Sequence, residues 1–271
     1  MEILEFNECF PDAPGEPVFT IVVFNDGDQL FTARATGRYS RKSEILAASF
    51  DDRVAIPTSA FQPQLTDTLF LSQVEPDDRM FVKRPSLLSY YHTDHTQDER
   101  IADDLLREAQ VYEKLRSSPH DNVVQYIGCE VKNGRISGLC LPRYKQSLMQ
   151  RLNPGSLGKR AFANSCSGNL DQGWCQKISE GIRAGLNNLH SLGLVHNDLN
   201  PSNILLDDQD IPRIVDFGSC RPEGESLTNV GRTYEWYNEA VQEASKKNDL
   251  DALAEIDAWM EGRVHDFKFM E

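Results

Sequence analysis

Residues 193–208, GLVHNDLNPSNILLDD, concentrate short polar side chains between two apolar stretches. Asp198 and Asn203 lie in this segment, and Asp216 follows in the sequence RIVDFGSC. Carboxylate and amide oxygens suit Mg²⁺, which commonly takes one or two protein carboxylates together with substrate phosphates. A carboxylate that is not bound to the metal is free to accept a hydroxyl proton. These residue types therefore indicate a magnesium site with a proton acceptor close to it.

The polar segment requires rigid elements on both sides to hold it. Residues 174–192 repeat apolar side chains every three or four positions, which predicts a helix that ends just before the segment. Residues 204–206 and 212–215 are short apolar runs typical of buried strands. The polar residues are thus predicted to lie on loops between core-forming elements, where catalytic groups are often found.

The first part of the chain is predicted to be rich in β-structure. Residues 18–24 and 29–36 flank NDGD, which is typical of a hairpin turn. Residues 44–50 and 54–57 are predicted to form further strands. No chemical motif occurs here, so we interpret residues 1–63 as a β-rich N-terminal extension.

A second β-rich region follows the extension. Residues 69–74 and 79–84 are predicted to form a hairpin, and residues 123–131 and 135–141 two more strands. Residues 99–116 carry apolar side chains at helical spacing, which predicts an amphipathic helix.

The character of the chain changes to helical after Pro142. Residues 153–173 are rich in Gly, Ser and Asn and are interpreted as a surface loop. Residues 240–260 are predicted to hold one or two helices. The predicted fold class is α+β, with a β-rich lobe to about residue 141 and a helical lobe over residues 142–271.

The charge and the cysteine pattern of the chain indicate which partners and which compartment to expect. The net charge of −14 disfavours nucleic acid, because an acidic chain repels phosphate backbones. The acidic N-terminus is unlike a signal peptide, and the apolar run at residues 18–24 is too short to span a bilayer. The six cysteines are scattered without a C-x-x-C pair, which favours reduced thiols. We therefore expect an intracellular, cytoplasmic protein with neither nucleic-acid nor membrane partners; the oligomeric state stays open.

The polar segment resembles the motifs of eukaryotic protein kinases. The family pattern H-R-D-L-x-x-x-N is matched by HNDLNPSN, and the later D-F-G is present unchanged. The resemblance implies that Asp198 orients the acceptor hydroxyl and takes its proton. It also implies that Asn203 and Asp216 hold the Mg²⁺ ions on ATP.

The resemblance extends to both sides of these motifs. MFVKRP is similar to the family's V-A-I-K strand, which implies that Lys83 pairs with the α- and β-phosphates. LLREAQVYEKL is similar to the following helix, which implies that Glu108 pairs with Lys83. KKNDLDALAEI resembles a later helix with Asp249 at its start. The likeness covers residues 64–260 and implies a bilobal kinase-like domain over residues 64–271, similar to divergent fungal-type members.

Four departures from the family pattern affect the expected activity. No glycine occurs between Gly37 and Gly128, so the Gly-rich loop expected near FQPQLTDT is missing. Asn197 replaces the arginine of H-R-D, which implies activity without phosphorylation of the activation loop. Asn200 stands where Ser/Thr kinases usually carry a lysine, and the helical lobe is shortened.

The implied function is an ATP- and Mg²⁺-dependent protein kinase of the serine/threonine type, acting on a protein of unknown identity. Two alternatives stay open. One is a pseudokinase, a scaffold or nucleotide-binding module with little or no transfer, which the missing glycines favour. The other is a small-molecule phosphotransferase resembling the aminoglycoside and choline kinases, which use a similar loop. The intact D-F-G sequence fits protein kinases better.

Overall fold

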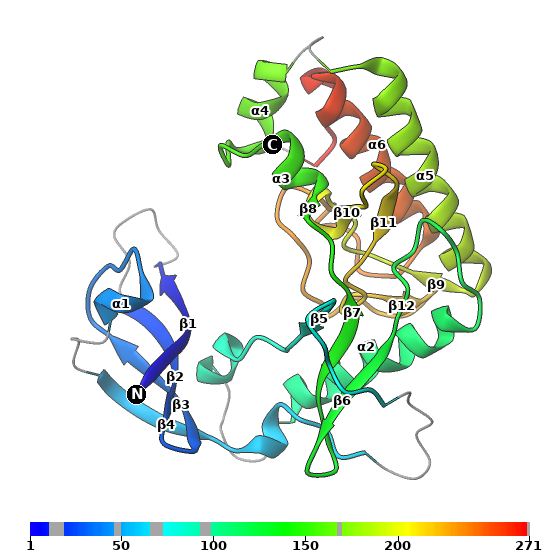
Figure 1. Cartoon of the computed structure of the whole chain (residues 1–271). Coiled ribbons are helices and arrows are strands. Elements are labelled where there is room, and N and C mark those ends of the chain that lie inside the picture. The colour runs from blue at the N-terminus through cyan, green and yellow to red at the C-terminus, as the bar shows by residue number, and fades with distance from the viewer. Residues whose placement is uncertain (11–18, 46–49, 66–72, 93–98, 167–169, 270–271) are drawn as a thin grey trace. The chain divides into compact units, whose positions relative to one another are not determined.

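The computed structural model describes the chain except residues 11–18, 46–49, 66–72, 93–98, 167–169 and 270–271 (Figure 1). The chain forms two compact units, each assembled from separate stretches of sequence. The first unit contains Met1–Val74, Val82–Arg107 and Cys129–Leu139. The second unit contains Glu75–Phe81, Glu108–Gly128 and Cys140–Glu271. The predicted domains, residues 1–63 and 64–271, stay a prediction.

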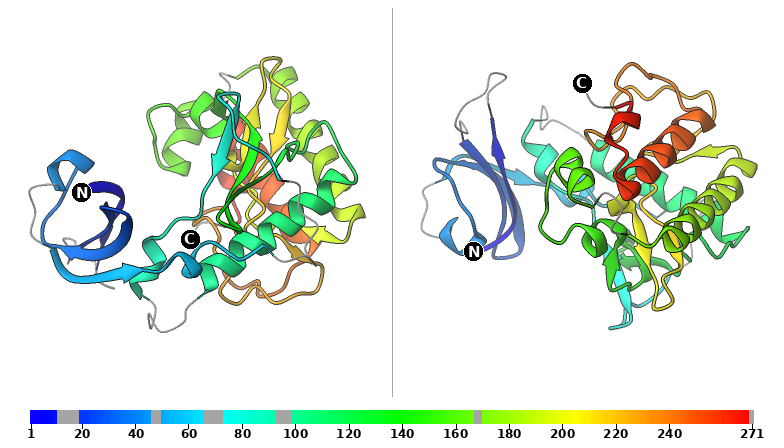
Figure 2. Two further views of the ribbon diagram at one scale, coloured as in Figure 1. Left: turned by 60° about the horizontal axis from the view of Figure 1, so that its bottom comes forward. Right: turned by 90° about the horizontal axis from the view of Figure 1, so that it is seen from above.

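The N-terminal sheet is antiparallel, and its described strands follow the order β1-β2-β3-β4 (Figures 1 and 2). Its strands are β1 (Glu2–Cys9), β2 (Phe19–Asp26), β3 (Gln29–Ala35) and β4 (Phe50–Ile56). The predicted hairpin is confirmed, with Asp26 opposite Gln29 at its end. The two-residue connection between β2 and β3 is possible because antiparallel neighbours can be joined by a tight turn.

The predicted strand at residues 44–50 is wrong in part. Helix α1 (Lys42–Ile45) includes the first two of these residues, and residues 46–49 lie outside the described chain. The carboxylate of Glu44 accepts hydrogen bonds from the N–H groups of Ser40 at 2.8 Å and Arg41 at 3.3 Å. Local side-chain bonds of this kind satisfy amides that a strand would have to pair with a neighbour.

Both faces of the N-terminal sheet are covered by apolar side chains. Because successive strand residues point to opposite faces, Val22 and Phe24 join one cluster with Ile45, and Val23 joins the other. The second cluster contains Leu87 and other residues that follow strand β5, together with Ala60 of η1 (Thr58–Ala60). The sheet is therefore packed against the segment that follows β5.

A second sheet has the order β5-β7-β6, formed by β5 (Met80–Lys83), β6 (Gly128–Lys132) and β7 (Arg135–Pro142). The strand predicted at residues 123–131 is thus shorter than expected, and Val123 makes an isolated bridge to Ile214. Gly138 allows β7 to approach β5 closely, since a Cβ there would lie 2.6 Å from Cγ1 of Val82. Helix α2 (Arg100–Arg116) confirms the predicted amphipathic helix.

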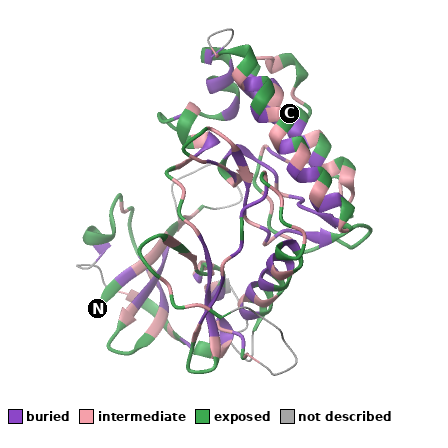
Figure 3. Cartoon of the chain, turned by 45° about the vertical axis from the view of Figure 1, so that its right-hand side comes forward, coloured by how far each residue is buried: buried purple, intermediate pink, exposed green. Residues whose placement is uncertain are grey.

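Long helices dominate the C-terminal part, where α5 (Gln172–Ser191) and α6 (Lys246–Glu261) lie side by side (Figures 1 and 2). Buried residues recur along α5, among them Ile178, Ile182 and Leu186. Figure 3 colours the buried residues of the long helices purple. Helix α3 (Leu148–Leu152) precedes them. The predicted surface loop at residues 153–173 is wrong over α4 (Lys159–Cys166).

Tertiary packing explains why α4 forms within a sequence of weak helical character. The ring of Phe162 packs against Trp259 of α6 with centroids 4.3 Å apart. Lys159 is buried and pairs with the carboxylate of Glu255 at 2.7 Å. Contacts with α6 therefore stabilise a helix whose own sequence favours a loop.

Short strands frame the polar segment. The strands are β8 (Gln146–Ser147), β9 (Leu194–Val195), β10 (Ile204–Leu206), β11 (Pro212–Ile214) and β12 (Arg221–Pro222). They pair in the orders β11-β10-β8 and β12-β9, which confirms the two predicted strands at residues 204–206 and 212–215. Gly185 lets α5 lie close behind them, since a Cβ there would be 2.9 Å from Cδ1 of Ile214.

Candidate active site

The loop between β9 and β10 brings Asp198 and Asn203 into direct contact. The amide nitrogen Nδ2 of Asn203 donates to the backbone oxygen of Asp198 at 2.9 Å and to its Oδ2 at 3.1 Å. The short helix η3 (Pro201–Asn203) lies between them and is capped by Asn200, whose Oδ1 accepts the N–H of Ser202 at 2.9 Å. The proline at the first position of η3 suits this cap, because its nitrogen needs no acceptor.

Thr233 contacts both oxygens of the Asp198 carboxylate. Its N–H donates to Oδ1 at 2.6 Å, and its hydroxyl donates to Oδ2 at 3.1 Å. The Nδ2 of Asn200 donates to the same hydroxyl at 3.1 Å, so this neutral amide binds the residue that orients Asp198. Burial raises the pKa of Asp198 above its usual range, although the hydrogen bonds from Thr233 oppose this rise.

The backbone of the loop is hydrogen-bonded to the buried carboxylate of Asp249 on α6. Its Oδ2 accepts the N–H of His196 at 2.9 Å, and its Oδ1 accepts the N–H of Asn197 at 2.8 Å. The ring of His190 lies 2.7 Å from Oδ2 as well. Asn197 adopts a left-handed conformation with φ of 63°, which few residues other than glycine do. The carboxylate therefore stabilises a strained turn immediately before Asp198.

His196 connects the loop to the segment that carries Asp216. Its Nδ1 accepts the N–H of Asp198 at 3.2 Å, and its Nε2 donates to the oxygen of Val215 at 2.9 Å, which together assign the hydrogen to Nε2. Its ring also packs against Phe217 with centroids 5.3 Å apart. In addition, the N–H of Val215 donates to the oxygen of Asn203 at 3.0 Å. The residue before Asp216 is thus bound to both ends of the loop.

Asp216 follows β11 in a left-handed conformation, with φ of 65°. Its Oδ1 accepts the N–H of Gly218 at 3.3 Å. The next residue, Phe217, is buried, and its N–H donates to Oε1 of Glu108 at 3.1 Å. The ring of Tyr112, one turn further along α2, packs edge-on against Phe217 with centroids 5.1 Å apart. Helix α2 is therefore joined to the D-F-G segment by a hydrogen bond and an aromatic contact.

Lys83 is the last residue of β5, in the first unit. The next residue, Arg84, donates to the oxygen of Ser137 at 2.7 Å and pairs with Glu130 at 2.7 Å. The predicted pairing of Lys83 with Glu108 joins residues of different units and stays a prediction. The Gly-rich loop of the family is expected near FQPQLTDT, which is residues 61–68. Residues 66–68 of this segment lie outside the described chain.

Sequence reasoning found the five motif residues and missed two supporting ones. Thr233 lies in GRTYEW, and nothing in the local sequence marks its contact with Asp198. Asp249 was noted at the start of a helix, but its acceptor role under the loop was missed. The sequence signal was its helical spacing from Ala252, Leu253 and Ile256, which places Asp249 on the apolar face of the helix.

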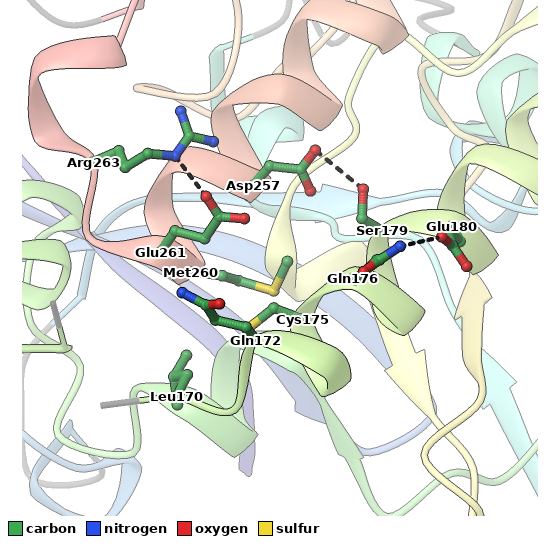
Figure 4. Close-up of a pocket in the computed structure, with 10 residues that line it drawn as sticks. All are labelled: Leu170, Gln172, Cys175, Gln176, Ser179, Glu180, Asp257, Met260, Glu261 and Arg263. Carbon is green, nitrogen blue, oxygen red and sulfur yellow. Dashed lines mark hydrogen bonds and ion pairs between the residues drawn. The ribbon is translucent and has the colours of Figure 1, made fainter. Parts of the chain in front are cut away.

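A cavity of about 700 Å³ lies between α5 and α6 and contains none of the motif residues (Figure 4). Cys175, Ser179 and Asp257 are among its lining residues. The hydroxyl of Ser179 donates to Asp257 at 3.0 Å, and burial raises the pKa of that carboxyl. The candidate active site at the polar loop is thus separate from this cavity.

Comparison with known proteins gives the same assignment as the motifs. The family model of the protein kinase domain matches residues 88–262, which is more than half of the chain. The chain belongs to the protein kinase family. The match confirms the predicted α+β class of this kinase domain, with a β-rich N-terminal region and a helical C-terminal part.

Several curated protein kinases resemble this kinase chain over part of their length. Serine/threonine-protein kinase STY17 of Arabidopsis thaliana is 30% identical over 141 residues, which cover 51% of this chain and 23% of that protein. Serine/threonine-protein kinase Tao of Drosophila melanogaster is 26% identical over 169 residues, covering 61% and 14%. Serine/threonine-protein kinase BCK1/SLK1/SSP31 of Saccharomyces cerevisiae is 28% identical over 162 residues, covering 59% and 10%. The chain thus spans less than a quarter of the length of these relatives.

Two further structural findings bear on the expected partners and cofactors. Within the described part of the chain, no helix is long and apolar enough to cross a membrane. Among the same residues, no group of three or more His, Cys, Asp or Glu side chains is arranged to hold a metal.

Proposed function

We propose that this chain transfers the γ-phosphoryl group of ATP, with Mg²⁺, to a serine or threonine hydroxyl of a protein substrate. The carrying observation is the Asp198 carboxylate, which is half-buried and oriented by Thr233 and Asn203. The names of the similar proteins, which are serine/threonine-protein kinases, support the choice of acceptor.

Asp198 is proposed to accept the proton of the substrate hydroxyl. Burial raises its pKa, which makes the carboxylate a better proton acceptor than an exposed aspartate. The hydrogen bonds from Thr233 and Asn203 restrict rotation of the carboxylate, so that its oxygens are positioned before a substrate binds.

Asn203 and Asp216 are proposed to hold the metal ions, and their chemistry fits that task. The Nδ2 of Asn203 is turned toward Asp198, so its Oδ1, the atom that Mg²⁺ prefers, lies on the other side of the amide. Bound ATP would supply the phosphoryl group, and bound Mg²⁺ would neutralise charge on the phosphates. Lys83 is proposed to bind the α- and β-phosphates, and Glu108 to position Lys83.

A nucleotide-binding module with little or no transfer is the second candidate, and Asn200 is the observation that favours it. The residue is buried, and its amide donates to Thr233 and to the backbone of Asp198. It therefore adds no positive charge where Ser/Thr kinases usually carry a lysine.

Transfer of labelled γ-phosphate to the protein itself and to generic protein acceptors tests the proposal. Asp198→Asn is expected to lower the rate by about a hundredfold or more, because a positioned base contributes that much. Asp208→Asn is the matched control, since this aspartate lies on an exposed turn and pairs with Lys145. A folded wild-type protein that transfers no faster than Asp198→Asn would refute the proposal and favour the second candidate.

A further inference from the structure

Glu5 of strand β1 binds the segment that joins β5 to α2. Its Oε2 accepts the hydroxyl of Ser86 at 2.5 Å, and its Oε1 accepts the N–H of Leu87 at 2.9 Å. These partners lie 81 and 82 positions away in the sequence. Both carboxylate oxygens are therefore used to hold residues 84–92, hereafter the linker, against the N-terminal sheet.

An irregularity in β1 directs Glu5 toward the linker. The pairing of β1 with β2 shifts between Ile3 and Glu5, so that Ile3 lies opposite Phe24 and Glu5 lies opposite Val23. Directly paired residues point to the same face of a sheet. Val23 belongs to the apolar cluster that contains Leu87, whereas Phe24 belongs to the cluster on the other face. The extra residue thus moves Glu5 to the face that meets the linker.

Apolar contacts accompany these hydrogen bonds along the linker and into α2. Leu87 and Tyr90 are buried in the cluster with Val23 and Ile56, and Ile101 in the first turn of α2 packs against it. The N-terminal sheet therefore contacts described residues of the linker and the first turn of α2.

The linker directly follows β5, and it shares an apolar cluster with Ile101 of α2, the helix that carries Glu108. Lys83 ends β5 immediately before the linker. Glu108 lies two turns beyond Ile101 on the same helix, where it accepts the N–H of Phe217 at 3.1 Å. A displacement of the linker would move Lys83 through the adjoining backbone. It would also disturb the packing of Ile101, which lies two turns before Glu108 on the same helix.

We propose that Glu5 is a positioning residue for phosphoryl transfer, which fixes the linker and thereby the placement of Lys83 and Glu108. This inference rests on the proposed kinase function. Glu8 on the same strand differs, because it pairs with Arg38 inside the N-terminal part of the chain at 3.1 Å. The strand thus offers a matched carboxylate that does not bind the linker.

The test compares Glu5→Ala, Glu5→Gln and Glu8→Ala by transfer kinetics, melting temperature and hydrogen exchange. For Glu5→Ala we expect faster exchange in the linker and in residues 100–107. We also expect a roughly tenfold lower kcat at a temperature well below unfolding, because small misplacements of catalytic groups are costly. Glu5→Gln should restore most of the rate, since its amide oxygen still accepts the Leu87 N–H. Glu8→Ala should leave kcat and linker exchange unchanged.

Ser86→Ala provides a milder variant if Glu5→Ala does not fold. The serine is exposed, and its replacement removes one donor, so an intermediate loss of kcat is expected. A lower melting temperature with unchanged kcat and unchanged exchange in residues 100–107 would overturn the inference, because Glu5 would then be merely structural.

Failure of the kinase proposal itself gives a different pattern. If the wild-type protein transfers nothing, affinity for a non-hydrolysable ATP analogue replaces kcat as the functional measurement. Weaker analogue binding by Glu5→Ala with normal binding by Glu8→Ala would support the positioning role. Equal affinity of the wild type, Glu5→Ala and Glu8→Ala, with exchange in residues 100–107 unchanged, would overturn it.

Discussion

The carboxylate of Glu130 on β6 contacts side chains on its own strand, on β7 and just after β5. It pairs with Arg84 at 2.7 Å and with Lys132 at 2.9 Å, and it accepts the hydroxyl of Ser137 at 2.6 Å. Burial by itself would raise the pKa of Glu130, but these three donors outweigh burial and lower it from 4.5 to about 2. Replacement by glutamine removes the charge and keeps the shape.

The size of the effect follows from this shift. A change in pKa from 4.5 to about 2 corresponds to an upper limit of about 3 kcal/mol in the free energy of unfolding. Arg84 and Lys132 are 49% and 59% exposed, so water screens both pairs. We therefore expect Glu130→Gln to lower the free energy of unfolding by about 1–2 kcal/mol at neutral pH.

The pH dependence gives the sharper test. Because the pKa is lowered by folding, the stabilisation is present above 4.5 and is lost as the pH falls toward about 2. Urea unfolding of both proteins at several pH values should show a difference near neutral pH that disappears in acid. Glu75→Gln is the control, since this glutamate is exposed and none of the three partners of Glu130 contacts it. A difference between wild type and Glu130→Gln that does not change with pH would refute the electrostatic explanation.

Three further predictions concern the C-terminal part. Asp249→Asn should lower the free energy of unfolding by about 3 kcal/mol or more in chemical denaturation, because buried donors lose a charged acceptor, whereas Asp251→Asn on the same helix should have little effect. Thr233→Val should slow labelled-phosphate transfer by roughly tenfold, since it removes a hydroxyl that donates to Asp198, the proposed proton acceptor; equal slowing by Thr228→Val, at an exposed position, would contradict this. The pKa of Asp257 is raised by burial, so its protonation stabilises the folded protein at low pH, and this stabilisation is lost as the pH rises. Asp257→Asn should accordingly raise the melting temperature at neutral pH and lose that advantage in acid.

Local patterns predicted the elements whose information lies within a few residues. The helices at residues 99–116 and 174–192 carry apolar side chains at helical spacing, and both formed as α2 and α5. The hairpin around NDGD formed because its turn and strand residues agree with each other. The order of the motif residues likewise indicated the protein kinase family, which the family match confirmed.

Contacts between distant residues determined the remaining features. Helix α4 forms in a sequence typical of a loop because Phe162 and Lys159 are buried against α6. Thr233 reaches Asp198 across 35 positions of sequence. A local pattern reports the preference of a segment for helix, strand or turn, but long-range hydrogen bonds and buried pairs exist only once the chain is folded. The sequence by itself therefore determined the family and the motif residues proposed to react, because both follow from the order of residues along the chain. The tertiary structure decided which distant residues contact that motif, because those contacts exist only in the folded chain.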